Sequence, residues 1–324
     1  MNTHLRRPLR AFAWGLGFAW ASAAFAQDFP SKPVTLVVPF AAGGAADVVA
    51  RVLAQNVRMK QPVIVDNKPG AGGTIAAAVV AKAPADGHTL LFVTAGHAGT
   101  RALYPSLSYD PVTGFVPVMG VSQSPIVIAV KADSPYRSMA DLVAAARAHP
   151  GKLNCAGGGG GATVTNLAFE QLKADLKLDI AAVPYKGSAP AVTALLGGEI
   201  DCDSDNVSAL LTMINAGKVR ALAVMSRSRA AALPDVPTVA ETVLPSMDAT
   251  AWFGILAPKG TPPAVVQELQ RQFAAALKEP QAKERLLSIS AEPMEMDGPA
   301  FGKLLASETV RWGGLIQKLG LKAE

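Results

Sequence analysis

The sequence predicts an α/β fold with mainly parallel sheets, divided between two domains. Apolar, β-branched segments alternate with segments of helical spacing along the chain, as in folds whose helices cover a parallel sheet. Several of these strands end in loops made almost entirely of glycine and alanine. With 324 residues, half of them hydrophobic, the chain is long enough that two domains are expected rather than one.

Residues 1–26 are typical of a secretory signal peptide. Three arginines, the last of them Arg10, precede a short apolar run over residues 11–24, and Ala24-Phe25-Ala26 is a small-x-small cleavage site. We therefore expect export to the periplasm with cleavage after Ala26. The alternative is an uncleaved N-terminal anchor, which the length of the run opposes, because about 20 apolar residues are needed to cross a bilayer.

Without the signal peptide the chain is close to neutral. Cleavage of the signal peptide removes three of the 30 basic residues and none of the 25 acidic ones. The mature chain then has 27 basic residues and a net charge of +2. The sequence has no basic run, and few aromatic residues stand among its lysines and arginines. Nucleic-acid binding is therefore not expected.

The chain is organised around residues 33–51. A predicted strand over residues 34–38 ends at Pro39, small residues follow, and Asp47 stands at the start of a helix with an apolar face. Gly43 and Gly44 let the backbone come close to a ligand. The helix start offers free N–H groups and the positive end of the helix dipole, which together favour an anion. The alternative is an ordinary tight turn, and Asp47 fits either a helix cap or a ligand contact.

The same plan recurs further along the chain. Predicted strands run into loops of small residues at 63–73, 90–97, 153–163 and 183–188. In open parallel sheets, ligands bind beyond the carboxyl ends of the strands. The sequence therefore predicts a site for a small negative ligand, in which His97 either donates to a carboxylate or has a structural role in its loop.

We predict that residues 27–124 and 248–324 form the first domain and that residues 125–247 form the second. The pattern changes near Pro125 and again around residues 244–250. The two crossings of the chain between the domains would act as a hinge. The strands expected from Pro125 onward include 126–130, 200–203, 221–225 and 252–256. The strand at 200–203 ends in residues 204–206, where Asp205 and Asn206 fit either a contact to a ligand hydroxyl or amine, or a turn. The expected helices lie at 138–148 with Ser138 as N-cap, at 189–196 and 208–215, from the turn-rich entry at 257–263 to about residue 278, and at 299–320.

Two cysteines are present, Cys155 and Cys202, each at or near the end of a predicted strand. In an oxidising compartment they could form a disulfide. The alternative is a pair of buried free thiols, and the spacing alone does not decide between them. No His/Cys cluster indicates a metal site.

These segments together resemble the Bug proteins, also called the tripartite tricarboxylate receptor family, which are periplasmic solute-binding proteins. The matching landmarks span essentially the whole mature chain in order. They lie at residues 37–44 with Asp47 and Arg51, 65–73, 84–90, 103–105, 109–111, 184–187, 216–224, 233–241 and 252–258.

The resemblance implies a two-domain periplasmic-binding-protein fold, similar to type II, with a hinge and an interdomain cleft that closes on a small carboxylate. In the family, backbone N–H groups and ordered water hold the carboxylate. The candidate ligand-binding residues, from the strand-end loops and from the family's positions, are Phe40, Ala41, Ala42, Gly43, Gly44, Asp47, Gly70, Ala71, Gly72, Gly73, Thr94, His97, Gly161, Thr163, Lys186, Gly187, Asp205 and Asn206.

The chain departs from the family pattern close to this site. Thr100-Arg101 replaces a common Asn-Pro pair, Asn166 replaces a common His, Ala46 stands where a hydroxyl residue is usual, and five glycines run over residues 157–161. Ligand identity is therefore not carried over. Arg101 could bind a second carboxylate in bidentate fashion, or form a surface salt bridge.

We expect a monomeric receptor without cofactor, metal or catalytic residue. It would bind a di- or tricarboxylate, an acidic amino acid or an aromatic acid for a tripartite tricarboxylate-type membrane transporter. One alternative is an orphan receptor that feeds a sensor. A secreted hydrolase is less favoured because no Gly-x-Ser-x-Gly elbow occurs, and the glycine run lacks the Gly-Lys-Ser/Thr ending of a phosphate-binding loop. An interaction module is disfavoured by the number of ligand-facing loops.

Overall fold

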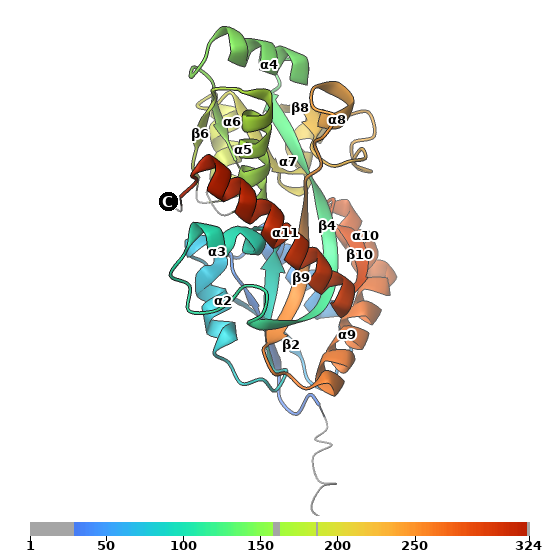
Figure 1. Cartoon of the computed structure of the whole chain (residues 1–324). Helices are drawn as coiled ribbons and strands as arrows, with labels where there is room; N and C mark the ends of the chain where they lie inside the picture. Colours follow the sequence, from blue (N-terminus) through green and yellow to red (C-terminus); the bar gives the residue numbers. More distant parts are fainter. Residues whose placement is uncertain (1–28, 158–162, 186, 323–324) are drawn as a thin grey trace, which may run out of the picture.

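The computed structural model describes residues 29–157, 163–185 and 187–322. Figure 1 shows two lobes, one above the other, joined by long strands. The signal peptide expected at residues 1–26 and two candidate ligand contacts, Gly161 and Lys186, lie outside the described residues.

The described strands form one ten-stranded mixed sheet, and β4 (Phe115–Lys131) runs through both lobes. In the first lobe β2, β1 and β3 are parallel, and β9 pairs antiparallel with β3 and β4. In the second lobe β7, β5 and β6 are parallel, while β7 and β8 pair antiparallel with β4. The other strands are β1 (Val34–Val38), β2 (Val63–Asn67), β3 (Thr89–Thr94), β5 (Asn154–Ala156), β6 (Ala181–Val183), β7 (Cys202–Asn206), β8 (Val219–Val224), β9 (Thr250–Pro258) and β10 (Glu292–Asp297).

The expectation of mainly parallel sheets is therefore only partly right. The two strands that connect the lobes, β4 and β9, run in opposite directions because the chain leaves the first lobe along one and returns along the other. A second difference concerns residues 204–206, which were expected to follow the strand at 200–203 rather than to belong to it. They belong to β7, where Asp205 pairs with Val127 of β4.

The helices cover the sheet in three hydrophobic clusters. One packs α1, α9 and α10 against the first lobe, and another packs α6 and α7 against the second. The largest continues from the first lobe into the second through α5 and α11. The helical segments are α1 (Ala45–Asn56), η1 (Ala71–Gly73), α2 (Thr74–Ala81), η2 (Ala95–Gly99), α3 (Thr100–Leu103), α4 (Met139–Ala148), α5 (Val164–Leu176), α6 (Ser188–Gly197), α7 (Val207–Asn215), α8 (Val239–Thr242), α9 (Pro263–Lys278), α10 (Pro280–Ser288) and α11 (Gly298–Leu319).

Local sequence signals explain where several helices begin and end. Ser138 caps α4 by accepting the N–H of Asp141, as predicted from the sequence. Asp297 caps α11 in the same way, and Gly320 ends that helix in the left-handed conformation. In the part of the chain that the structure covers, none of the helices combines the length and the apolar composition that crossing a bilayer requires.

The long helix α11 lies across the strands that join the lobes (Figure 1). Its Phe301 is fully buried, and the Cζ of that ring would lie 2.1 Å from a Cβ placed on Gly254 of β9. Only glycine at position 254 therefore lets the aromatic ring pack directly on the strand backbone. This packing fixes α11 to the first lobe next to the crossing strands.

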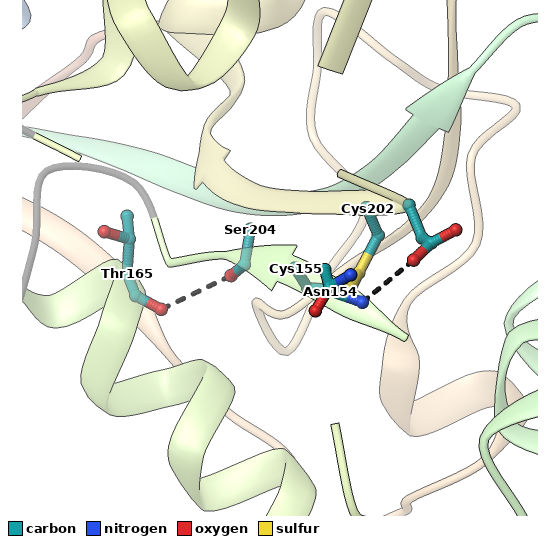
Figure 2. Close-up of a disulfide and its surroundings, with 6 residues drawn as sticks. Asn154, Cys155, Thr165, Cys202 and Ser204 are labelled. Carbon is teal, nitrogen blue, oxygen red and sulfur yellow. Dashed lines mark hydrogen bonds between the residues drawn. A yellow bond between two sulfur atoms is a disulfide. The ribbon is translucent and has the colours of Figure 1, made fainter. Parts of the chain in front are cut away.

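A disulfide joins Cys155 and Cys202, which are register partners on the parallel strands β5 and β7. Their Cα atoms are 4.6 Å apart. Figure 2 shows the bond beside Ser204, whose hydroxyl donates to the carbonyl oxygen of Thr165 at the start of α5. Of the two alternatives for the cysteines, the structure therefore has the disulfide. This bond joins two strands that end at the candidate site.

We expect the double substitution Cys155→Ser with Cys202→Ser to lower the free energy of unfolding by about 2–4 kcal/mol, because it removes a covalent link that restricts the unfolded chain. Urea unfolding of the mature protein measures this loss. Reducing agent should destabilise the parent protein similarly and leave the double variant unchanged. Equal unfolding midpoints for parent and variant would contradict the prediction.

Candidate ligand-binding site

Helix N-termini gather at the carboxyl ends of the parallel strands in both lobes. In the first lobe α1 follows β1, and η1 and α2 follow β2; in the second lobe α5 follows β5 and α6 follows β6. The first-turn N–H groups of a helix have no acceptor within that helix, and the dipole adds partial positive charge there. Each lobe therefore presents backbone donors suited to an anion at this edge of the sheet.

The two lobes pack together near these edges. Gly99 lies in η2 directly after β3, and Leu167 lies in the first turn of α5. A Cβ added to Gly99 would lie 3.2 Å from Leu167 Cδ1 and 3.1 Å from Ile316 Cδ1 of α11. The carboxyl end of a first-lobe strand therefore meets the start of a second-lobe helix.

The loop between β1 and α1 is held in shape by Asp47, which is 2% exposed. Its Oδ2 accepts the backbone N–H of Gly43 at 2.8 Å and the Nε of Arg51 at 2.9 Å. Its Oδ1 accepts the amide of Asn67 at 3.0 Å, and this amide also donates to the carbonyl oxygen of Phe40. One carboxylate thus joins the loop, its own helix and the end of β2.

The ionised form of Asp47 is the favoured one. Burial alone would raise its pKa, but the hydrogen bonds from Arg51, Gly43 and Asn67 and the charge of Arg51 outweigh burial and leave the pKa below its usual value. Of the two roles expected for Asp47, the structure supports the structural one, because both carboxylate oxygens already accept bonds from the protein.

This network also changes which backbone donors are available to a ligand. The N–H of Gly43 donates to Asp47, and the N–H of Gly44 makes a 3.4 Å turn bond to the carbonyl oxygen of Ala41. The first intrahelical bond of α1 runs from Val48 to Gly44. The donors that the helix itself cannot satisfy are therefore those of its first turn, beginning with Ala45 and Ala46.

The second loop of the first lobe, Gly70 to Gly73, forms a compact turn. The N–H of Gly73 donates to the carbonyl oxygen of Gly70 at 3.0 Å, and the Thr74 hydroxyl donates to that of Ala71. Beside this turn lies a pocket of about 10 Å³, which is room for roughly one water molecule. It is lined by Pro39, Gly72, Gly73, Leu91, Val93, Thr94 and His97.

Of the two roles expected for His97, donation to a carboxylate does not fit its contacts. Its Nε2 lies 2.9 Å from the carbonyl oxygen of Pro111, which can only accept, so Nε2 carries the proton. Burial lowers the pKa of His97 to about 4, although the Pro111 bond and the charge of Asp110 oppose this shift. The imidazole is therefore neutral near pH 7 with its one N–H in use, and the structural alternative is the one supported.

In the second lobe, hydroxyl groups shape the entry to α5. Thr163 is the N-cap and accepts the N–H of Asn166 at 3.3 Å. The hydroxyls of Thr163 and Thr165 both donate to the carbonyl oxygen of Gly157, where the glycine run begins. Gly187 has a φ of +122° and precedes the first residue of α6. That backbone conformation favours glycine and leads the chain into the helix.

Asp205 and Asn206 close β7 at the same edge. Asp205 is 1% exposed, and its Oδ1 accepts the N–H of Asn206 at 2.7 Å. Burial raises the pKa of Asp205 to about 6, while the Ser188 hydroxyl of α6 and the Asn206 N–H act to lower it. The second-lobe edge thus combines helix N-termini with a buried carboxyl group.

Of the two alternatives for Arg101, a contact to a second ligand carboxylate and a surface salt bridge, the structure has the salt bridge. One of its guanidinium nitrogens donates to the carbonyl oxygen of Tyr109 at 3.0 Å and lies 3.5 Å from a carboxylate oxygen of Asp110. Both side chains of this ion pair are more than 40% exposed. The arginine therefore stabilises the turn that follows α3.

Sequence reasoning missed the part that Asn67 and Ser188 play. The pairing of Asp47 with Arg51 could have been read from their spacing of four on one helix face. Asn67 and Ser188 are brought to their partners by strand pairing and helix packing, which leave no local signal. Across the described ranges, no group of three or more His, Cys, Asp or Glu side chains is arranged to hold a metal ion.

Comparison with known proteins identifies relatives along nearly the full chain. The family model described as "Tripartite tricarboxylate transporter family receptor" matches residues 49–321. The "UPF0065 protein in tcbD-tcbE intergenic region" of Pseudomonas sp. is 39% identical over 99% of this chain and 96% of its own length. Protein BugT of Bordetella pertussis is 36% identical, with 92% of each chain covered.

Solved structures of periplasmic binding proteins are similar to this chain in both fold and sequence. Periplasmic binding protein BugD has a TM-score of 0.83 at 35% identity, covering 91% of this chain and all of its own. R. palustris Rpa4515 with adipate has a TM-score of 0.85 at 36% identity, covering 91% and 99%. MatC from Rhodopseudomonas palustris with bound malate has a TM-score of 0.82 at 34% identity, covering 89% and 100%.

The family match, the identities and the shared fold agree with the resemblance seen in the sequence. The chain therefore belongs to the Bug, or tripartite tricarboxylate transporter receptor, family of periplasmic solute-binding proteins.

Proposed function

We propose that this protein is a periplasmic receptor that binds a small carboxylate between its two lobes and delivers it to a tripartite tricarboxylate-type transporter in the inner membrane. The observations that support the proposal are the helix N-termini that follow the parallel strands in each lobe, and the packing of Leu167 beside Gly99, where the two lobes meet. Carboxylates bound to two relatives, adipate and malate, support the ligand class. The class includes di- and tricarboxylates, acidic amino acids and aromatic acids.

In this proposal the carboxylate accepts hydrogen bonds mainly from backbone groups. On the first lobe they come from the loop of residues 40–44 with the first turn of α1, and from the loop of residues 70–73. On the second lobe they come from the starts of α5 and α6, at Thr163 and Gly187. Asp205 and Asn206 would contact the rest of the ligand. Asp47 and His97 would support the loops without touching it.

We also propose that the domains comprise residues 27–124 with 248–324, and residues 125–247, and that they close about the crossing strands. Exclusion of water on closure would strengthen the hydrogen bonds to the carboxylate. We propose export with cleavage after Ala26, in agreement with the family's periplasmic location and with a disulfide at Cys155–Cys202. Delivery to a sensor instead of a transporter is the alternative use of the same receptor.

The ligand class is tested by thermal unfolding of ligand-stripped mature protein in the presence of small acids. A ligand at 100 times its dissociation constant stabilises the folded state by about 2.7 kcal/mol, which raises the melting temperature measurably. Citrate, malate, adipate, glutamate and nicotinate form the panel, and their methyl esters serve as uncharged controls. We expect at least one acid to stabilise the protein while its ester does not. Stabilisation by none of them would contradict the carboxylate proposal.

The role of the α1 N-terminus is tested by Ala45→Pro. Ala45 is the first helical residue, where proline is favoured, and the preceding Gly44 is extended at φ −76° and ψ 168°, as a residue before proline should be. The substitution removes one free N–H and should leave the melting temperature near that of the parent. We expect carboxylate affinity, measured by calorimetry, to fall about tenfold or more, because a hydrogen bond to a charged group is lost.

Ala45→Ser is the matched control, since it changes the side chain and keeps the N–H. Its affinity should equal that of the parent. Unchanged affinity in Ala45→Pro would show that the first turn of α1 does not hold the ligand.

A further inference from the structure

Two buried acceptors at the end of β7 have no hydrogen-bond donor in the described ranges of the chain. The Oδ2 atom of Asp205 and the Oδ1 atom of Asn206 are both buried and find no hydrogen-bond partner among the residues that the structure describes. Buried polar atoms without partners are rare in folded proteins and costly to stability. A pair of them on neighbouring residues therefore requires an explanation.

These two atoms do not make the structural hydrogen bonds that are usual at their positions. Asn206 is the N-cap of α7, a position at which an asparagine side chain usually accepts an N–H of the first turn, yet it makes no such bond. Asp205 uses Oδ1 for the adjacent Asn206 N–H, and the nearby Ser188 hydroxyl acts to lower its pKa. Within the described part of the chain, each of the two residues keeps an acceptor atom to which no hydrogen bond is made.

The two acceptors stand at the edge proposed to bind the ligand. Asp203 of β7 is the register partner of Ala156, the last residue of β5. Asp205 lies two residues further, beyond the end of β5 and beside the entry to α6 at Ser188. The helix starts of both lobes offer N–H donors, whereas this end of β7 offers oxygen acceptors.

We propose that the ligand carries a hydroxyl or amino group in addition to its carboxylate, and that Asp205 Oδ2 and Asn206 Oδ1 accept hydrogen bonds from that group. The substrate class is thus hydroxy- or amino-carboxylic acids rather than plain carboxylic acids. The inference rests on the proposed function, because the carboxylate must first be held by the helix N-termini. A site built to bond a hydroxyl or amino group rejects the analogue that lacks it, since the buried acceptors then stay unpaired.

Matched pairs of acids test the inference by calorimetry on the mature protein. The pairs are propionate with lactate, phenylacetate with mandelate, and succinate with malate or aspartate. We expect the hydroxy or amino member of at least one pair to bind about tenfold tighter or more, as a hydrogen bond to a charged acceptor provides. Equal affinities in every pair that binds would overturn the inference and leave the receptor proposal standing. Absence of binding by all of these acids and by the thermal panel would overturn both.

The variant Asp205→Asn tests whether Asp205 causes the preference for hydroxy or amino acids over plain acids. The amide keeps the size of the side chain and replaces one acceptor oxygen by a donor, so we expect the preference to fall below about threefold while affinity for the plain acid is retained. Asp201→Asn is the matched control. Asp201 precedes β7 and accepts the Asn154 N–H at 2.8 Å, at the opposite end of the β5–β7 pair, so its variant should keep the full preference.

A second variant, Asn206→Ala, provides the test if Asp205→Asn does not fold. Asn206→Ala removes the other acceptor, and no capping bond depends on that side chain, so the fold should persist. We expect it to reduce the preference for the hydroxy or amino acid. Retention of the full preference by a folded Asp205→Asn protein, or by Asn206→Ala if the first does not fold, would overturn the assignment.

Discussion

The constraint on which the rest of this structure depends is that an α-helix cannot satisfy the N–H groups of its own first turn. Four helices place such groups at the carboxyl ends of parallel strands, and the approach of Gly99 to Leu167 brings the two lobes' edges together. In the proposed site the free donors of one lobe would act together with those of the other. Glycine and alanine in the loops let the backbone come close to a bound group. In the proposed site, the charge of the ligand would be met mainly by oriented dipoles rather than by a buried cation.

Fixed dipoles act only if the loops that carry them are held in place. Asp47 does this in the first lobe by bonding Gly43, Arg51 and Asn67 at once. In the second lobe the Cys155–Cys202 disulfide and the hydroxyls of Thr163 and Thr165 hold the start of the glycine run. The charged groups of the site thus serve mostly to position backbone. The acceptors Asp205 Oδ2 and Asn206 Oδ1 are the exception, because no described residue donates a hydrogen bond to them.

Local sequence patterns predicted the alternation of strands and helices, the cap at Ser138 and the small-residue loops after the strands. They could not predict that β4 continues through Pro125 from one lobe into the other, because the pairing that stabilises this strand comes from β9, more than 120 residues later. The placement of Asp205 in a strand was missed for the same reason, since its partner is Val127. The sequence left two roles open for His97, because the group that bonds its Nε2, the carbonyl of Pro111, lies in a separate turn.

In the proposed mode of binding, backbone N–H groups of both lobes together bind one small carboxylate. The most direct measurement is the change in backbone amide resonances of isotope-labelled mature protein as the tightest-binding acid is added. The account predicts saturable shifts at the first turn of α1, at Ala45 and Ala46, and also at the starts of α5 and α6, all with one dissociation constant. Shifts confined to one lobe, or spread over exposed surface without saturation, would contradict it.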